Sequence, residues 1–264
     1  MQSHEITIEI GGHPVLLRTK DHRFRDLLVK RYAGFIRGKA NSSFDFEIDL
    51  LSAPAQPCDD DVCVECTDGM WRMRRGDFVA EVDAAQGHGR IRQTANPYSI
   101  DSVLRIVHSL ILAREGGFLL HSASAIRNGG AFLFSGISGA GKTTISRLAP
   151  PDAKLLTDEI SYIRRQGETY YACGTPFSGE LQRSGENCSA PVCRLFFLQH
   201  GLENKVESLS QTDALRRLLR NTLFFAEDEV LVKKIFQAAG EFLDRVPAQQ
   251  LTFLPDSRVW SMIQ

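Results

Sequence analysis

The sequence predicts an α/β (α+β) protein: a P-loop core with a mixed central sheet flanked by helices, preceded by a smaller α+β N-terminal part. Three observations lead to this prediction. Apolar residues alternate with polar ones over much of residues 5–94, which indicates strands. Helical spacing of apolar residues begins after residue 96, and a glycine-rich motif typical of phosphate binding occupies Gly136–Thr143. We therefore expect two domains, residues 1–96 and residues 97–264.

Composition and charge narrow the class of protein. The chain has 264 residues, of which 43% are hydrophobic and 24% charged, as in ordinary globular proteins. Its formal net charge of -1 gives no electrostatic attraction for nucleic acid or anionic membranes. The N-terminus has no secretory signal pattern, and no apolar run approaches the roughly 18 residues of a spanning helix. We expect a cytoplasmic protein with neither nucleic acid nor membrane as a partner.

The N-terminal part is expected to form a small α+β region that recognises a substrate or partner. Asp21–Ile36 has one apolar stripe at helical spacing, whereas its neighbours alternate with a period of two. The expected order is strand 5–10, a turn at Gly11-Gly12, strand 15–17, helix 21–36, strand 44–50, a loop over residues 54–61 and a meander over residues 62–94.

Four cysteines raise the question of a zinc site. Cys63 and Cys66 form a C-x-x-C pair, and Cys188 and Cys193 form a looser one. An offset of three in a regular strand places Cys63 and Cys66 on opposite faces, whereas a zinc site needs a turn there. Ordinary reduced thiols are therefore favoured over zinc ligands.

The C-terminal part begins with a helix from near Asp101 to the Gly116-Gly117 pair. Two strands, 119–126 and 131–134, flank Asn128-Gly129, the preferred two-residue hairpin turn. The remaining expected elements are helix 144–148, strands 154–157, 170–171 and 194–198, and helices 212–223 and 229–243. The charges of the last two helices are interpreted as solvated faces.

Gly136–Thr143 matches the pattern G-x-x-x-x-G-K-[ST] between the expected strand 131–134 and helix 144–148. Glycines let successive backbone N–H groups turn toward one anion. Lys142 is expected to reach the β- and γ-phosphates of ATP, and the Thr143 hydroxyl to bind Mg²⁺. The predicted nucleotide-binding residues are Gly136, Ser138, Gly139, Ala140, Gly141, Lys142, Thr143 and Thr144.

The hairpin register places a histidine beside this motif. If Arg127 pairs with Gly130, then His121 lies opposite Gly136. A titratable imidazole would thus stand at the mouth of the phosphate site. A strand-end histidine satisfied by the backbone is an equally weighted alternative.

An acidic pair, Asp158-Glu159, follows the expected strand 154–157. A carboxylate at this place is typical of a Mg²⁺ ligand or a catalytic base. Because neighbouring strand residues point to opposite faces, we expect only Asp158 to face the phosphates, with Glu159 either a further metal ligand or solvated. The metal ligands considered are Thr143, Asp158 and Glu159. Glu180, in a turn-rich segment, is either a contact to metal or substrate or a surface residue.

These motifs resemble the HPr kinase/phosphorylase family. The resemblance rests on the histidine-containing strand Leu120–Ala123, the P-loop and the acidic pair, and it is closer to HPr-kinase-related proteins, some of which are found beside peptide-modification genes. Thr175–Glu180 also looks like that group. The resemblance implies a phosphoenolpyruvate carboxykinase-like nucleotide-binding fold. Glu159 replaces the family's second aspartate, and its downstream glycine-rich segment is not found, which argues against HPr as the substrate.

What the resemblance implies is an ATP- and Mg²⁺-dependent serine/threonine phosphotransferase acting on a protein or peptide hydroxyl. Lys142 and Thr143 would serve the nucleotide and metal, Asp158 would act as general base or metal ligand, and His121 would lie near the transferred phosphoryl group. A kinase of a small hydroxylated metabolite and a non-catalytic nucleotide-binding regulator are the alternatives. A homo-oligomer is left open.

Overall fold

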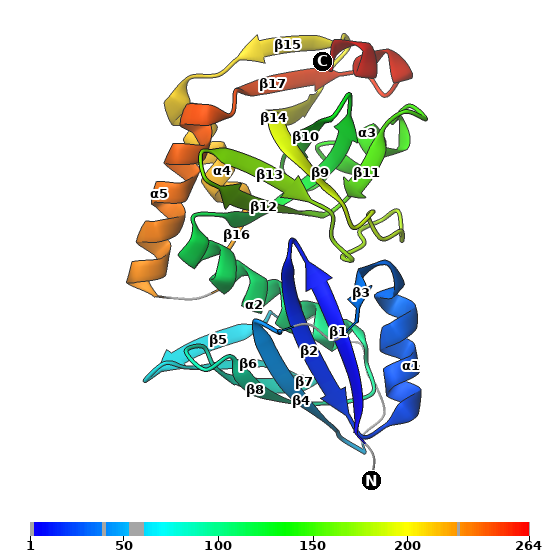
Figure 1. The fold of residues 1–264 in the computed structure, drawn as a ribbon. Helices are drawn as coiled ribbons and strands as arrows, with labels where there is room; N and C mark the ends of the chain where they lie inside the picture. The colour runs from blue at the N-terminus through cyan, green and yellow to red at the C-terminus, as the bar shows by residue number, and fades with distance from the viewer. Residues whose placement is uncertain (1–2, 39–40, 53–60, 226–227, 264) are drawn as a thin grey trace. The chain divides into compact units, whose positions relative to one another are not determined.

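The computed structural model describes residues 3–38, 41–52, 61–225 and 228–263, and it is a mixed α/β structure with two mixed sheets (Figure 1). One unit comprises Met1–His108 with Phe225–Glu229, and the other comprises Ser109–Phe224 with Val230–Gln264. Helix α2 (Tyr98–Glu115) spans the division between the units. No helix within the described ranges is long and apolar enough to cross a membrane.

The first unit holds an eight-stranded sheet among its described residues, with the order β3-β1-β2-β4-β8-β7-β6-β5. The predicted meander over residues 62–94 is confirmed as the four antiparallel strands β5 to β8. The loop predicted over residues 54–61 falls mostly outside the described residues. The strands are β1 (His4–Ile10), β2 (His13–Thr19), β3 (Ile36–Arg37), β4 (Phe44–Leu50), β5 (Cys63–Thr67), β6 (Met70–Arg75), β7 (Phe78–Asp83) and β8 (His88–Gln93).

Cys63 and Cys66 lie in β5, which pairs regularly with β6. Their offset of three therefore places them on opposite faces of the strand, as the sequence predicts.

The predicted helix over Asp21–Ile36 is too long. Helix α1 (His22–Arg31) begins at the N-cap Asp21, whose Oδ1 accepts a hydrogen bond from the Phe24 N–H at 2.9 Å. It ends at Arg31 and is followed by a 3₁₀ turn, Ala33–Phe35. Ile36 then pairs with Ile8 of β1. The end of the predicted helix is therefore a 3₁₀ turn and the start of a strand, which sequence periodicity does not distinguish.

The second unit contains a nine-stranded sheet in which two long strands take part in several pairings. β9 pairs with β12 through its first half and with β10 through its second half. β14 likewise pairs with β13 near its start and then lies parallel to β10 and β17. The strands are β9 (Phe118–Arg127), β10 (Gly130–Ser135), β11 (Lys154–Thr157), β12 (Ile160–Gln166), β13 (Thr169–Cys173), β14 (Ser189–His200), β15 (Lys205–Ser208), β16 (Thr222–Leu223) and β17 (Ala248–Phe253). The helices are α3 (Lys142–Arg147), α4 (Gln211–Asn221), α5 (Glu229–Arg245) and the C-terminal 3₁₀ turn Ser257–Met262.

β10 is apolar along its whole length because both of its faces are buried. Leu133 packs in one hydrophobic cluster, with residues of α4 and α5. Phe132 and Phe134 pack in a second cluster, with Ile145 of α3 and Trp260 of the C-terminal turn. This two-sided burial explains the continuous apolar run, and it holds the end of the strand in place.

The β9–β10 hairpin confirms the predicted register. Arg127 pairs with Gly130, and the pairing continues to Ser122 opposite Ser135. Both turn residues have positive φ, 51° at Asn128 and 80° at Gly129, as a type I′ turn requires. His121 therefore lies one position beyond the last pair, level with Gly136.

The sequence did not predict β12, β15 or β17, and β14 is longer than the expected strand 194–198. The expected helix 212–223 is too long, because it ends at Asn221 and the next two residues form β16, which pairs with β9. Ile160–Gln166 carries two adjacent arginines, which obscure its alternation. Ala248–Phe253 is a polar-rich strand that is half-buried because it pairs on both sides, with β14 and β15. Neighbouring strands, rather than local sequence, make these segments extended.

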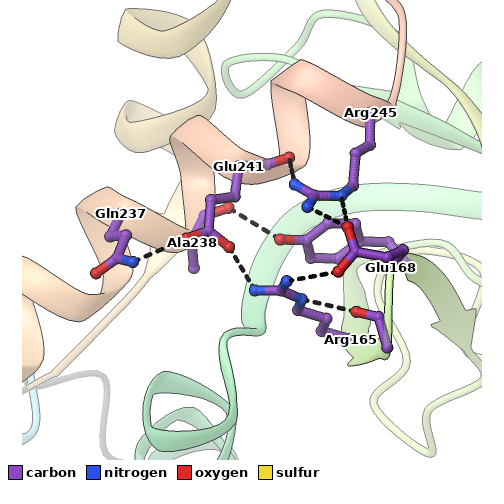
Figure 2. Close-up of polar contacts among 8 residues, drawn as sticks. Arg165, Glu168, Gln237, Ala238, Glu241 and Arg245 are labelled. Atoms are coloured by element: carbon purple, nitrogen blue, oxygen red, sulfur yellow. Dashed lines mark hydrogen bonds and ion pairs between the residues drawn. The ribbon is translucent and has the colours of Figure 1, made fainter.

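A network of charged side chains joins the β12–β13 hairpin to α5 (Figure 2). Arg165 pairs with both Glu168 and Glu241. Arg245 also pairs with Glu168, and Gln237 Nε2 donates to Glu241 Oε1 at 2.8 Å. Because the Glu168 side chain is 78% exposed, solvent screens its two pairs, and these orient the hairpin more than they stabilise it.

Candidate functional site

The glycine-rich loop Gly136–Gly141 connects the end of β10 to the start of α3, in the strand–loop–helix order that the sequence predicts. Gly141 has a φ of +103°, and a Cβ at this position would lie 2.6 Å from Cζ of Phe253. Gly139 has a φ of +78°. Residues with a side chain rarely adopt either conformation, so the path of the loop requires glycine at both positions.

A cavity of about 290 Å³ borders this loop, and we call it the first cavity. It brings together the predicted residues His121, Ser138, Gly139, Gly141, Lys142, Thr143, Thr144, Asp158 and Glu159. Gly179, Glu180 and His200 complete its lining. The remaining predicted loop residues, Gly136 and Ala140, line a neighbouring cavity instead.

Lys142 is 9% exposed, and its ammonium group donates to two carbonyls of its own loop. Nζ lies 2.9 Å from the Gly136 oxygen and 3.2 Å from the Ile137 oxygen. Burial lowers the pKa of Lys142, although the negative charges of Glu180 and Glu159 oppose this shift. No carboxylate of the described residues forms an ion pair with it. An anion placed beside Nζ would therefore stabilise the charged form.

Asp158 follows β11 and is 3% exposed. Its Oδ1 accepts a hydrogen bond from the Gly179 N–H and its Oδ2 one from the Leu181 N–H, both at 2.9 Å. The carboxylate thus anchors the loop between β13 and β14. Each oxygen has a second lone pair, so Asp158 keeps acceptor capacity toward the first cavity.

The expectation that only Asp158 of the acidic pair faces this site is wrong, because Glu159 also lines the first cavity. The two residues lie in the bend between β11 and β12 rather than within a strand. Strand alternation therefore does not apply to them.

Gly179 is needed for the close approach of its loop to the acidic pair. A Cβ at this position would lie 3.0 Å from Asp158 Oδ2 and 3.2 Å from the Glu159 Cβ. Glu180 then lines the first cavity, next to the charge of Lys142. The segment that the sequence identified as rich in turn residues is thus part of the site, rather than a distant surface turn.

The donor atoms around the first cavity fit a hard divalent cation. Thr143 supplies a hydroxyl, and Asp158 and Glu159 supply carboxylates, which are the oxygen ligands that Mg²⁺ prefers. The described residues hold no cluster of three or more His, Cys, Asp or Glu side chains arranged as a preformed metal site. Mg²⁺ that keeps several waters and binds together with phosphates needs no such cluster.

His121 is half-buried at the first cavity, and its backbone carbonyl accepts a hydrogen bond from Ser135 Oγ at 3.0 Å. Its place beside the loop is the one that the hairpin register predicts. The side chain therefore lies among the predicted phosphate-binding residues, whatever its role there.

The sequence interpretation missed His200. Its Nε2 lies 2.6 Å from the Gly139 oxygen, and its ring stacks on Phe253 with centroids 5.9 Å apart. The signal that could have identified it is its place at the end of β14, which runs parallel to β10. The carboxyl ends of parallel strands meet at one edge of a sheet, where ligands bind.

A comparison with known families identifies the chain. The family model described as SynChlorMet cassette protein ScmC matches residues 91–264, which is more than half of the sequence. No curated protein matches the chain. The predicted membership of the HPr kinase/phosphorylase-related P-loop kinase family is therefore wrong. That resemblance rested on a short motif block, and loops of this kind recur in many families. The chain belongs to the ScmC family.

Proposed function

We propose that this member of the ScmC family binds ATP and Mg²⁺ at a P-loop, Gly136–Thr143, and transfers the γ-phosphoryl group to a hydroxyl of a protein or peptide. One observation carries the proposal. The first cavity gathers, from separate elements, a buried lysine, a hydroxyl and carboxylates beside a loop that requires glycine. Such a combination suits a bound polyphosphate with its cation.

Each residue has a distinct part in this proposal. Lys142, whose ammonium group donates to loop carbonyls, contacts the β- and γ-phosphates. Thr143 and Asp158 hold Mg²⁺, with Glu159 as a further oxygen donor. Mg²⁺, when bound, offsets the negative charge of the phosphates. His121 and His200 lie on the same cavity and offer ring N–H groups to phosphate oxygens.

The transfer step is mainly one of positioning. The acceptor oxygen forms a bond to the γ-phosphorus, while the bond from that phosphorus to the bridging oxygen breaks and ADP leaves. The hydroxyl proton passes to the Asp158 carboxylate. The two N–H groups that hold this carboxylate fix its orientation for the transfer.

One observation favours a second candidate, a nucleotide-binding regulator without transfer. Both oxygens of Asp158 already accept backbone hydrogen bonds, so the carboxylate has a structural role in holding the loop at Gly179 and Leu181 that involves no proton transfer. In this case, ATP binding would order the loop that Asp158 anchors, and the first unit would contact a partner. A kinase of a small hydroxylated metabolite would differ from the proposed protein or peptide kinase only in the molecule that accepts the phosphoryl group.

Two measurements test the proposal. Thermal unfolding with ATP, with and without Mg²⁺, measures binding, and we expect a rise in melting temperature that depends on Mg²⁺. Transfer of label from γ-labelled ATP to a mixture of serine- and threonine-containing peptides measures the reaction. Binding without transfer to peptides or to hydroxylated metabolites would favour the regulator, and absence of Mg²⁺-dependent binding would refute both.

A further inference from the structure

A second cavity, of about 400 Å³, also borders the glycine-rich loop. It is bounded by the loop residues Gly136–Ala140, by the end of β14 (residues 197–200) and by Arg217, Arg220 and Asn221 of α4. The sequence interpretation treated the charges of this helix as a solvated face. The structure instead places two of its arginines beside the loop.

The second cavity borders the end of the proposed phosphate site where the terminal phosphoryl group would lie. Lys142, which contacts the β- and γ-phosphates in a P-loop, directs Nζ to the carbonyls of Gly136 and Ile137. Both of these residues line the second cavity. Ser138, Gly139 and His200 line both cavities. The terminal phosphoryl group would therefore lie at the border between the two.

The two cavities differ in charge. Asp158, Glu159 and Glu180 line the first, whereas no acidic residue of the described chain lines the second. Arg217 is held in place, because its Nη1 donates to Gln250 Oε1 at 3.1 Å and its guanidinium lies 5.9 Å from the centre of the Phe197 ring.

Arg220 is exposed, and no ion pair or hydrogen bond joins it to another described residue. A guanidinium has five donors, and one that pairs with no carboxylate of the described residues can bind an anionic ligand. At the rim, Ile137 is 59% exposed and offers an apolar contact suited to a peptide.

We propose that the second cavity is the acceptor site, and that it selects a serine- or threonine-containing peptide with acidic residues beside the hydroxyl. Arg220 pairs with a carboxylate of the peptide, and the preoriented Arg217 provides a second donor. The inference rests on the proposed function, since the cavity is identified as an acceptor site by its position at the γ-phosphate end of the loop. The peptide lies in the second cavity, and its hydroxyl reaches the border with the first cavity, which Asp158 lines. There the hydroxyl oxygen gains the phosphoryl group, ADP leaves and the hydroxyl proton passes to Asp158.

The test uses two labelled peptides with one serine each, flanked in one by glutamates and in the other by lysines. Fluorescence anisotropy measures their binding to the full chain at low salt, with and without Mg²⁺ and a non-hydrolysable ATP analogue. We expect the acidic peptide to bind at least about tenfold more tightly than the basic one. R220Q is expected to weaken the acidic peptide about fivefold to tenfold.

R216Q is the matched control, because Arg216 lies on the same helix, is 76% exposed and does not line the second cavity. It should leave acidic-peptide binding within about twofold of the wild type. Equal affinity for both peptides, or equal losses in R216Q and R220Q, would overturn the inference.

A third measurement separates acceptor binding from an action of Arg220 on the phosphoryl group. Release of phosphate from ATP in the absence of peptide is measured for R220Q, with R216Q, which should match the wild type, as the control. A fall in this hydrolysis with peptide binding intact would assign Arg220 to the transferred group and refute the acceptor role. Failure of the proposed function is distinguishable, because it appears as absence of Mg²⁺-dependent ATP binding, whichever peptide binds.

Discussion

Two polar regions of the second unit contain the same kinds of residue but pair them differently. In the network between the β12–β13 hairpin and α5, each arginine meets a glutamate, and Arg165 meets two (Figure 2). Beside the glycine-rich loop, the hydrogen bonds to described residues differ: Lys142 donates to carbonyls, and Asp158 accepts from backbone N–H groups. The first region satisfies its charges internally. The second keeps charge available for a ligand, and this difference, rather than the number of charges, identifies it as the candidate site.

The largest effect is expected from K142A, which removes the ammonium group that donates to the loop carbonyls. Transfer of label from ATP should fall at least about a hundredfold, because the lysine contributes to both nucleotide binding and stabilisation of the transferred group. Transfer assays and ATP-dependent thermal shifts measure the two contributions. R245A is the control, because Arg245 belongs to the network between the β12–β13 hairpin and α5, and it should retain wild-type activity. Equal activity of K142A and R245A would contradict the comparison.

D158N is expected to have the next largest effect. An amide offers an N–H group where the loop already presents one, so a hydrogen bond to Gly179 or Leu181 is lost. We expect about 1–3 kcal/mol less stability and a loss of transfer. Denaturant unfolding and the labelled-ATP assay check both. Full activity in D158N would refute the base and metal-ligand roles and leave the anchoring role alone.

G179A and G240A are expected to change the stability of the protein in opposite directions. The added methyl group at residue 179 meets Asp158 Oδ2 at 3.0 Å, so the loop must shift by a few tenths of an ångström, at a cost of about 1 kcal/mol and reduced transfer. At Gly240 in α5, nothing lies within 4 Å. Alanine there should stabilise the helix by about 0.5–1 kcal/mol and leave transfer unchanged. Equal effects of the two would show that the loop does not constrain the acidic pair.

The smallest effect is expected from E168Q, in the network of Glu168 with Arg165 and Arg245. Glu168 is exposed and its pairs are screened, so the melting temperature should change by no more than about two degrees. Activity should not change. A marked loss of activity would show that the network, despite its internal pairing, supports the site.

Local sequence signals predicted the glycine-rich loop and the position of His121 well. The hairpin turn Asn128-Gly129 sets the register that places His121 beside the loop, and the positive φ values of Gly139 and Gly141 explain the glycine pattern. In contrast, Glu159 was assigned by a strand rule that fails in a bend. The family was also misassigned, because a motif of this length reports local chemistry and not descent.

By itself, the sequence determined the glycine-rich loop, the hairpin that leads to it and the identity of its lysine, because turn chemistry and strand register act between residues close in the chain. Only the tertiary structure decided which distant groups face that loop. His200 at the end of β14, Gly179 against Asp158 and Arg220 on α4 are brought there by the parallel pairing of β10 with β14 and by the packing of α4 on the sheet. Such long-range pairings arise from the burial of both faces of β10, and no short stretch of sequence specifies them.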